Sequence, residues 1–135
     1  MSDDVRVYIF VESRYKVSRR RIRNAIIATL KKHAISSLVE VSVAFVGDRK
    51  MHFLNKTYRG KDSTTNILSF SLTEGNPVLY PPKVKALEEG ILRLGDIVIS
   101  YPQIIKEAVA EEMLVDDKID ELVIHGLSHL LGIHH

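Results

Sequence analysis

The chain has 135 residues, of which 45% are hydrophobic and 27% charged, proportions that are typical of one soluble folded domain. It contains no cysteine, which excludes disulfide bonds and thiolate ligands for a metal. Its formal net charge is only +2, but residues 1–61 hold 14 basic and 5 acidic residues, whereas residues 62–135 hold 5 and 12. The first apolar run is too short for a signal peptide or a membrane span, so we expect a cytoplasmic protein.

The first predicted helix carries a dense run of positive charge. Apolar residues predict a strand over about residues 5–12, and Ser18 is a typical N-cap for a helix over about residues 18–34. Arginines follow in its first turn, where cations oppose the helix dipole by a few tenths of a kcal/mol to about 1 kcal/mol. Because such conflicts often mark function, these side chains are candidates for binding phosphate, and a solvated basic face is the alternative. The candidates are Arg19, Arg20, Arg21 and Arg23.

The middle of the chain alternates between strand and helix. A second strand is predicted near residues 38–46, and the helix after it is expected to be capped by Asp48 and to end at Gly60. A third strand covers residues 66–70. Prolines and glycines then predict a loop over residues 71–93.

The remaining elements complete the predicted fold. A strand near residues 95–100 precedes a helix with Pro102 at its first position, and Asp116 is expected to cap a last helix. The strand–helix–strand–helix–strand order at the start implies parallel pairing of the first three strands with right-handed crossovers. We therefore predict a single α+β domain over residues 1–135, in which a small mixed sheet of about four strands packs with helices. No glycine-rich phosphate loop is present, so no dinucleotide site is expected.

The end of the chain carries three histidines at H-x-x-x-H-x-x-x-x-x-H spacing. His125 and His129 are four residues apart, so they share one face of a helix. Gly132 permits the chain to reverse and to bring His135 back toward them. Three histidines leave one position open for water, and zinc lowers the pKa of such a water to about 7. We therefore predict one hydrolytic Zn²⁺ site per chain, on the C-terminal helix and the turn after it.

The same spacing is similar to the metzincin protease signature, in which glutamate follows the first histidine and acts as the general base. Here that residue is Gly126. A protease function therefore lacks its base.

The segment resembles more closely the signature of the YbeY family, H-G-x-x-H-L-x-G-x-x-H. Residues 54–62 and 64–70 are similar to the family's second block, and residues 94–100 to its third. The three blocks occur in order over residues 54–135, which makes the match specific.

The resemblance implies a zinc-dependent endoribonuclease that cuts single-stranded RNA during ribosomal RNA maturation and ribosome quality control. It implies the RNA and proteins of the small ribosomal subunit as partners. Metal-bound water would attack the phosphodiester, with His125 in the catalytic set as a metal ligand. The arginine of the Tyr-Arg-Gly segment, Arg59, would stabilise the phosphorane, because a guanidinium offers two parallel donors to phosphate oxygens. A cation that satisfies the helix dipole is the alternative for Arg59. By their own chemistry, the arginines of the basic helix and Lys61 are candidates for contact with RNA, and solvated side chains are the alternative for both.

The chain departs from the family pattern at several positions. Asn66 replaces an aspartate, so it cannot serve as a general base, and Ile133 and His134 precede the last histidine where tyrosine and aspartate are common. Two alternatives stay open. One is a non-catalytic ribosome assembly factor whose metal is structural, with His134 as a fourth ligand, and the other is a metal-dependent hydrolase of another substrate.

Overall fold

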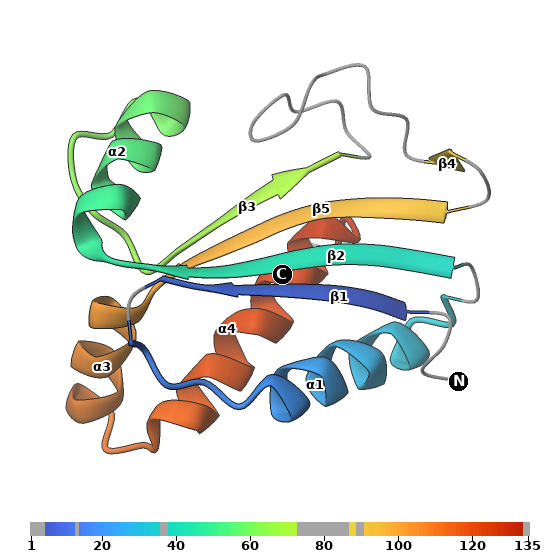
Figure 1. The fold of residues 1–135 in the computed structure, drawn as a ribbon, viewed down its shortest axis with the longest axis horizontal. Helices are drawn as coiled ribbons and strands as arrows, with labels where there is room; N and C mark the ends of the chain where they lie inside the picture. The colour runs from blue at the N-terminus through green and yellow to red at the C-terminus, as the bar shows by residue number, and fades with distance from the viewer. Residues whose placement is uncertain (1–4, 13, 36–37, 73–86, 89–90, 134–135) are drawn as a thin grey trace.

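The computed structural model describes residues 5–12, 14–35, 38–72, 87–88 and 91–133. In chain order its elements are β1 (Val5–Val11), α1 (Arg19–Lys32), β2 (Leu38–Val46), α2 (Asp48–Arg59), β3 (Ile67–Ser71), β4 (Leu87–Glu88), β5 (Ile91–Ser100), α3 (Tyr101–Ala110) and α4 (Val115–Leu130). Figure 1 shows a twisted sheet with α1 and α4 on one side and α2 on the other. Within the described ranges, no helix has the length and apolar character needed to cross a membrane.

The sheet has the strand order β1-β2-β5-β3, and the short β4 also pairs with β5. β1 and β5 run parallel to β2, whereas β3 runs antiparallel to β5. The predicted α+β fold with a mixed sheet is therefore confirmed. The expected parallel pairing holds for β1 and β2 but is wrong for β3, because β5 inserts between β2 and β3.

The predicted loop over residues 71–93 is wrong at both ends. Ser71 still belongs to β3, Leu87–Glu88 form β4, and β5 begins at Ile91. Residues 73–86 and 89–90 of that loop lie outside the described residues.

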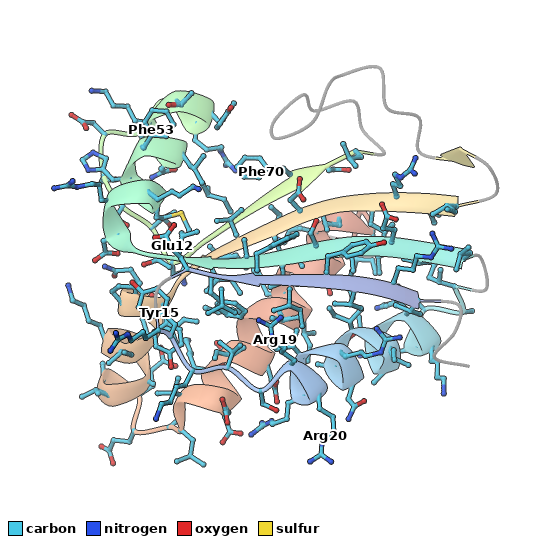
Figure 2. The ribbon with its side chains drawn as sticks, in the orientation of Figure 1. Glu12, Tyr15, Arg19, Arg20, Phe53 and Phe70 are labelled. Carbon is cyan, nitrogen blue, oxygen red and sulfur yellow. The ribbon has the colours of Figure 1, made fainter. Side chains whose placement is uncertain are left out.

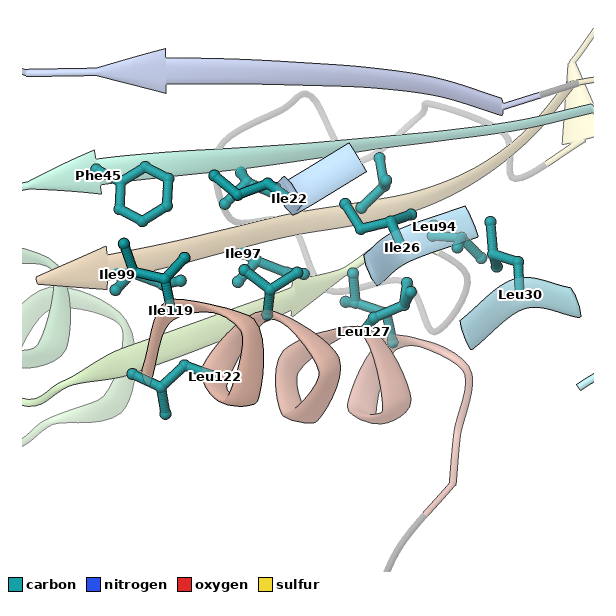
Figure 3. Close-up of a cluster of buried hydrophobic side chains, with 14 of the residues drawn as sticks. Ile22, Ile26, Leu30, Phe45, Leu94, Ile97, Ile99, Ile119, Leu122 and Leu127 are labelled. Carbon is teal, nitrogen blue, oxygen red and sulfur yellow. The ribbon is translucent and has the colours of Figure 1, made fainter. Parts of the chain in front are cut away.

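Side chains alternate along the strands, so the two faces of the sheet build two separate hydrophobic clusters. The larger cluster joins α1 and α4 to the sheet (Figure 3). Its fully buried members include Ile22, Ile26, Phe45, Ile97, Ile99, Ile119 and Leu127. On the other face, Met51 and Leu54 of α2 pack against Leu68, Phe70 and Val98. α2 and α4 therefore lie on opposite faces of the sheet.

The helix starts agree only in part with the predicted caps. The Ser18 hydroxyl accepts a hydrogen bond from the Arg21 amide at 3.3 Å, which confirms it as the N-cap of α1. The predictions of Asp48 and Asp116 as N-caps are wrong, because α2 starts at Asp48 itself and α4 starts at Val115, one residue before Asp116. Gly47 and Leu114 take the N-cap positions without a side-chain hydrogen bond, and both aspartates fall in the first turn. In the first turn a negative charge stabilises the helix dipole. Asp48 also accepts hydrogen bonds from Ser100 and Gln103, and Asp116 forms an ion pair with Arg21.

Candidate metal centre

Two of the three predicted metal ligands lie side by side on α4. The ring centroids of His125 and His129 are 4.6 Å apart with an angle of 57° between the ring planes. Both residues are exposed. His135 and His134 lie outside the described residues, and within the described part of the chain no three metal-binding side chains gather. The helix thus supplies two imidazoles at one surface position, as the i and i+4 spacing predicts.

These histidines face away from α1. Arg21 of α1 binds Asp120 on α4, which marks the flank of α4 that contacts α1. An α-helix turns by about 100° per residue, so His129, nine positions later, lies about 180° around α4 from Asp120. The opposite flank, which carries the histidines, is therefore free of α1 and open to a ligand.

Gly126 brings α4 close to the sheet beneath the histidines. A Cβ atom at this position would lie 3.0 Å from Cγ2 of Ile97 and 3.1 Å from Cδ1 of Ile67. Gly126 is buried between the helix and strands β5 and β3. The position that holds the catalytic glutamate in metzincins thus points into the core here, so a side chain there would not reach a metal between the histidines.

Asp96 does not support the histidines. It alternates with Ile97 along β5, so it lies on the face opposite α4, and it is only 4% exposed. Its Oδ1 accepts a hydrogen bond from the Ser42 hydroxyl at 2.6 Å. The preceding Gly95 has a φ of +137°, and a Cβ there would lie 2.0 Å from the Phe70 carbonyl oxygen, so only glycine fits this bulge.

Arg59 is the last residue of α2 and is exposed, just before Gly60 ends the helix in the left-handed conformation. Arg59 belongs to α2 and the histidines to α4, and these two helices pack on opposite faces of the sheet (Figure 1). Lys61 is also exposed at this end of α2. The neighbouring Asp62 binds His52 at 2.6 Å, which lowers the pKa of the Asp62 carboxyl.

The arginines of α1 have different partners. Arg19 donates to the Ile9 carbonyl at 2.8 Å, and Arg23 donates to the Val5 carbonyl at 3.0 Å. Arg21 instead forms ion pairs with three aspartates of α4, of which Asp120 is the nearest at 2.5 Å and Asp116, at the start of that helix, the farthest at 4.0 Å. The hydrogen bonds that Arg21 donates to Asp117 and Asp120 raise the pKa of Arg21, so its charge is permanent. The run of arginines thus fixes α1 to β1 and to α4.

Two polar clusters were not foreseen from the sequence. Asp48 accepts hydrogen bonds from Ser100 at 2.7 Å, from Gln103 at 3.1 Å and from Thr64 at 3.2 Å. Lys118 is 4% exposed, and its Nζ lies 2.9 Å from Glu121 and 3.0 Å from Glu111. The hydrogen bond that Lys118 donates to Glu121 is the main reason that the pKa of Lys118 is raised. Of these contacts, only the ion pair between Lys118 and Glu121 follows from the sequence, because residues three apart are neighbours on a helix.

Comparison with known proteins gives one consistent family. The profile described as Endoribonuclease YbeY matches residues 9–135. A protein named Endoribonuclease YbeY from Caldanaerobacter subterraneus subsp. tengcongensis is 38% identical over 111 residues, which cover 82% of this chain and 70% of that protein. One of the same name from Syntrophus aciditrophicus is 35% identical over 124 residues, covering 92% of this chain and 71% of that protein.

A solved structure supports the fold. The solution structure of TM1509 from Thermotoga maritima has a TM-score of 0.59 and 23% sequence identity, and the match covers 96% of this chain and 74% of that one. The α+β fold agrees with this match, and the chain belongs to the YbeY endoribonuclease family.

Proposed function

We propose that this protein is a metal-dependent endoribonuclease that hydrolyses single-stranded RNA. The observation that carries the proposal is the exposed His125 and His129 pair, with ring centroids 4.6 Å apart, in a chain of the YbeY family. The related proteins are named as endoribonucleases, and the site is of a kind that performs hydrolysis.

The donor set fits zinc. Imidazole nitrogens are common zinc ligands, and the absence of cysteine in the chain leaves histidines and carboxylates to bind the ion. His125, His129 and His135 are the proposed ligands, with one ion per chain. Zinc bound by three histidines supplies a Lewis acid and a water whose pKa is about 7.

Gly126 and Arg59 are the two residues outside the proposed ligand set to which we assign a role. Gly126 sets how closely α4 approaches β3 and β5, and so fixes the position of both histidines relative to the sheet. The role of Arg59 in stabilising the transferred phosphate stays a prediction.

The biological setting is also a proposal. We propose that the substrate is ribosomal RNA, that the small ribosomal subunit or its proteins are the partners, and that the protein acts in the cytoplasm. The support is the similarity of three sequence blocks to the YbeY family.

Cleavage of a labelled single-stranded RNA tests the proposal. The purified chain is stripped with a chelator, reloaded with zinc, and compared with His129→Ala and with Arg59→Ala, using Arg49→Ala at the exposed start of α2 as a matched control for charge. We expect cleavage only after reloading, loss of cleavage in His129→Ala, and wild-type cleavage in Arg49→Ala. Equal cleavage by stripped protein and by His129→Ala would rule out the metal mechanism.

A further inference from the structure

The free edge of β1 and the side of α1 form a groove lined by Val7, Ile9, Arg19, Arg20 and Arg23, with a volume of about 300 Å³. Among the strands that the structure describes, β1 pairs only with β2, so its other edge is the outer edge of this sheet. We propose that this groove binds the phosphate backbone of single-stranded RNA, and that Phe10 beside it stacks on a base. The proposal rests on the proposed endoribonuclease function and adds a binding site separate from the histidines.

Arg19 and Arg20 supply the positive charge on which the proposed site depends. Arg19 binds a backbone carbonyl, and neither Arg19 nor Arg20 forms an ion pair with any residue that the structure describes. Figure 2 shows Arg19 turned toward β1 and Arg20 on the outer side of α1. Arg21 differs, because three aspartates already surround its guanidinium, so the groove does not depend on it. Arginines held beside an apolar floor suit the phosphates and sugars of a nucleic acid strand.

The edge of β1 is closed to a protein strand. A β-strand that joins a sheet edge must bond to the carbonyls of that edge. The guanidinium group of Arg19 already donates a hydrogen bond to the Ile9 carbonyl, and that of Arg23 donates one to the Val5 carbonyl. An acidic protein segment would therefore lose the backbone bonds that normally stabilise such an addition, whereas RNA needs only the charged side chains.

An exposed aromatic side chain lies beside the groove. Phe10 is 60% exposed and sits one residue from Ile9, so it projects on the opposite face of the same strand. Arg6 and Tyr8 share that face, and Tyr8 is 45% exposed. A single-stranded RNA whose phosphates bind the arginines can place its bases on this face of β1. There the bases can stack on the aromatic rings, which is the usual mode of single-strand recognition.

The groove and the histidines lie on opposite sides of α1 and α4. α1 covers one flank of α4, and the histidines occupy the other flank. RNA bound in the groove is thus held by residues that take no part in hydrolysis. Variants of the groove are therefore expected to raise KM for long RNA and to leave kcat unchanged.

The test measures binding without cleavage. The full chain in chelator is titrated with fluorescent single-stranded RNA of mixed sequence at several salt concentrations, and the wild type is compared with Arg20→Gln, Phe10→Ala and Lys50→Gln. Lys50 is exposed on α2, away from the groove, and is the matched control for loss of one charge. Thermal unfolding confirms that each variant is folded.

We expect Arg20→Gln to lower the slope of log affinity against log salt by about 0.7, the value for one phosphate contact in a single strand. Phe10→Ala should weaken binding by about five-fold or more with an unchanged slope, because stacking contributes about 1–3 kcal/mol per base. Lys50→Gln should bind like the wild type. If Arg20→Gln and Phe10→Ala bind like the wild type, or if an acidic peptide competes better than RNA, the groove is not the RNA site.

The outcome is separable from the endoribonuclease proposal. RNA binding that depends on the groove, in a chain that never cleaves after zinc is added, supports the groove and contradicts the proposed function. Cleavage that depends on His129, with groove variants unaffected in affinity and KM, overturns the groove and leaves the function intact.

Discussion

Replacement of Asp48 tests how the end of the sheet is held together. Asp48 is the first residue of α2, and its carboxylate accepts hydrogen bonds from Thr64 before β3, from Ser100 at the end of β5 and from Gln103 in α3. A hydrogen bond to a charged group contributes about 1.5–3 kcal/mol. Asp48→Ala removes at least two good bonds, so we expect a loss of about 3–5 kcal/mol at pH 7, a large part of the about 5–15 kcal/mol that stabilises a typical domain.

The sign of the pH dependence follows from the carboxyl group. Burial raises the pKa of Asp48, but the hydrogen bonds from Ser100, Gln103 and Thr64 outweigh it, so the pKa is lowered overall. A lowered pKa in the folded state adds stability above the ordinary aspartate pKa of about 3.9, and this stability is lost as the pH falls through the folded value. The difference in the free energy of unfolding between the wild type and Asp48→Asn should therefore be largest at pH 7 and should decrease below about pH 4.

The assay is urea unfolding of the wild type, Asp48→Ala and Asp48→Asn at pH 7 and in steps to about pH 2.5. Glu112→Gln is the control, since Glu112 is exposed and its carboxylate forms no ion pair with a residue that the structure describes. A difference below about 1 kcal/mol at pH 7, or one that stays constant down to low pH, would refute the assignment of these hydrogen bonds as stabilising.

Two further predictions concern α4. Gly126→Ala places a Cβ 3.0 Å from Ile97, and we expect it to destabilise the protein by up to about 2 kcal/mol, since overpacking costs about 1–3 kcal/mol and the better helix propensity of alanine returns about 1 kcal/mol. The loss of unfolding free energy caused by Gly126→Ala should be smaller in a chain that also carries Ile67→Val, which removes the Cδ1 atom. If urea unfolding shows that the losses of the two single variants simply add, the close packing is contradicted. Arg21→Gln should lower the melting temperature by a few degrees, because Asp116, Asp117 and Asp120 then repel one another. Asp120→Asn in the same chain should restore part of the loss, and no restoration would show that the ion pairs do not hold α1 to α4.

Periodicity in the sequence was sufficient for the elements that build the site. The apolar pattern located the main strands, and the spacing of His125 and His129 placed them on one helical face, as found. The helix end at Gly60 was also predictable, because glycine adopts the left-handed conformation there.

Tertiary contacts explain what local reasoning missed. Cations in the first turn of α1 oppose its dipole, but Arg21 finds its carboxylates 96 and 99 residues away, and no local pattern could show that. The antiparallel pairing of β3 depends on β5, which comes later in the chain. The placement of Arg59 on the other face from the histidines follows from the same topology, because α2 packs on the face that α4 leaves uncovered.

Metal content measured beside RNA cleavage tests the central claim most directly. Tag-free wild type and His129→Ala are analysed for zinc by elemental analysis, and both are assayed on a labelled single-stranded RNA before and after chelation. The account predicts about one zinc per wild-type chain, its loss in His129→Ala, and cleavage that chelation abolishes. Zinc without cleavage would instead favour an assembly factor with a structural metal. Cleavage by protein that contains no metal would contradict the account.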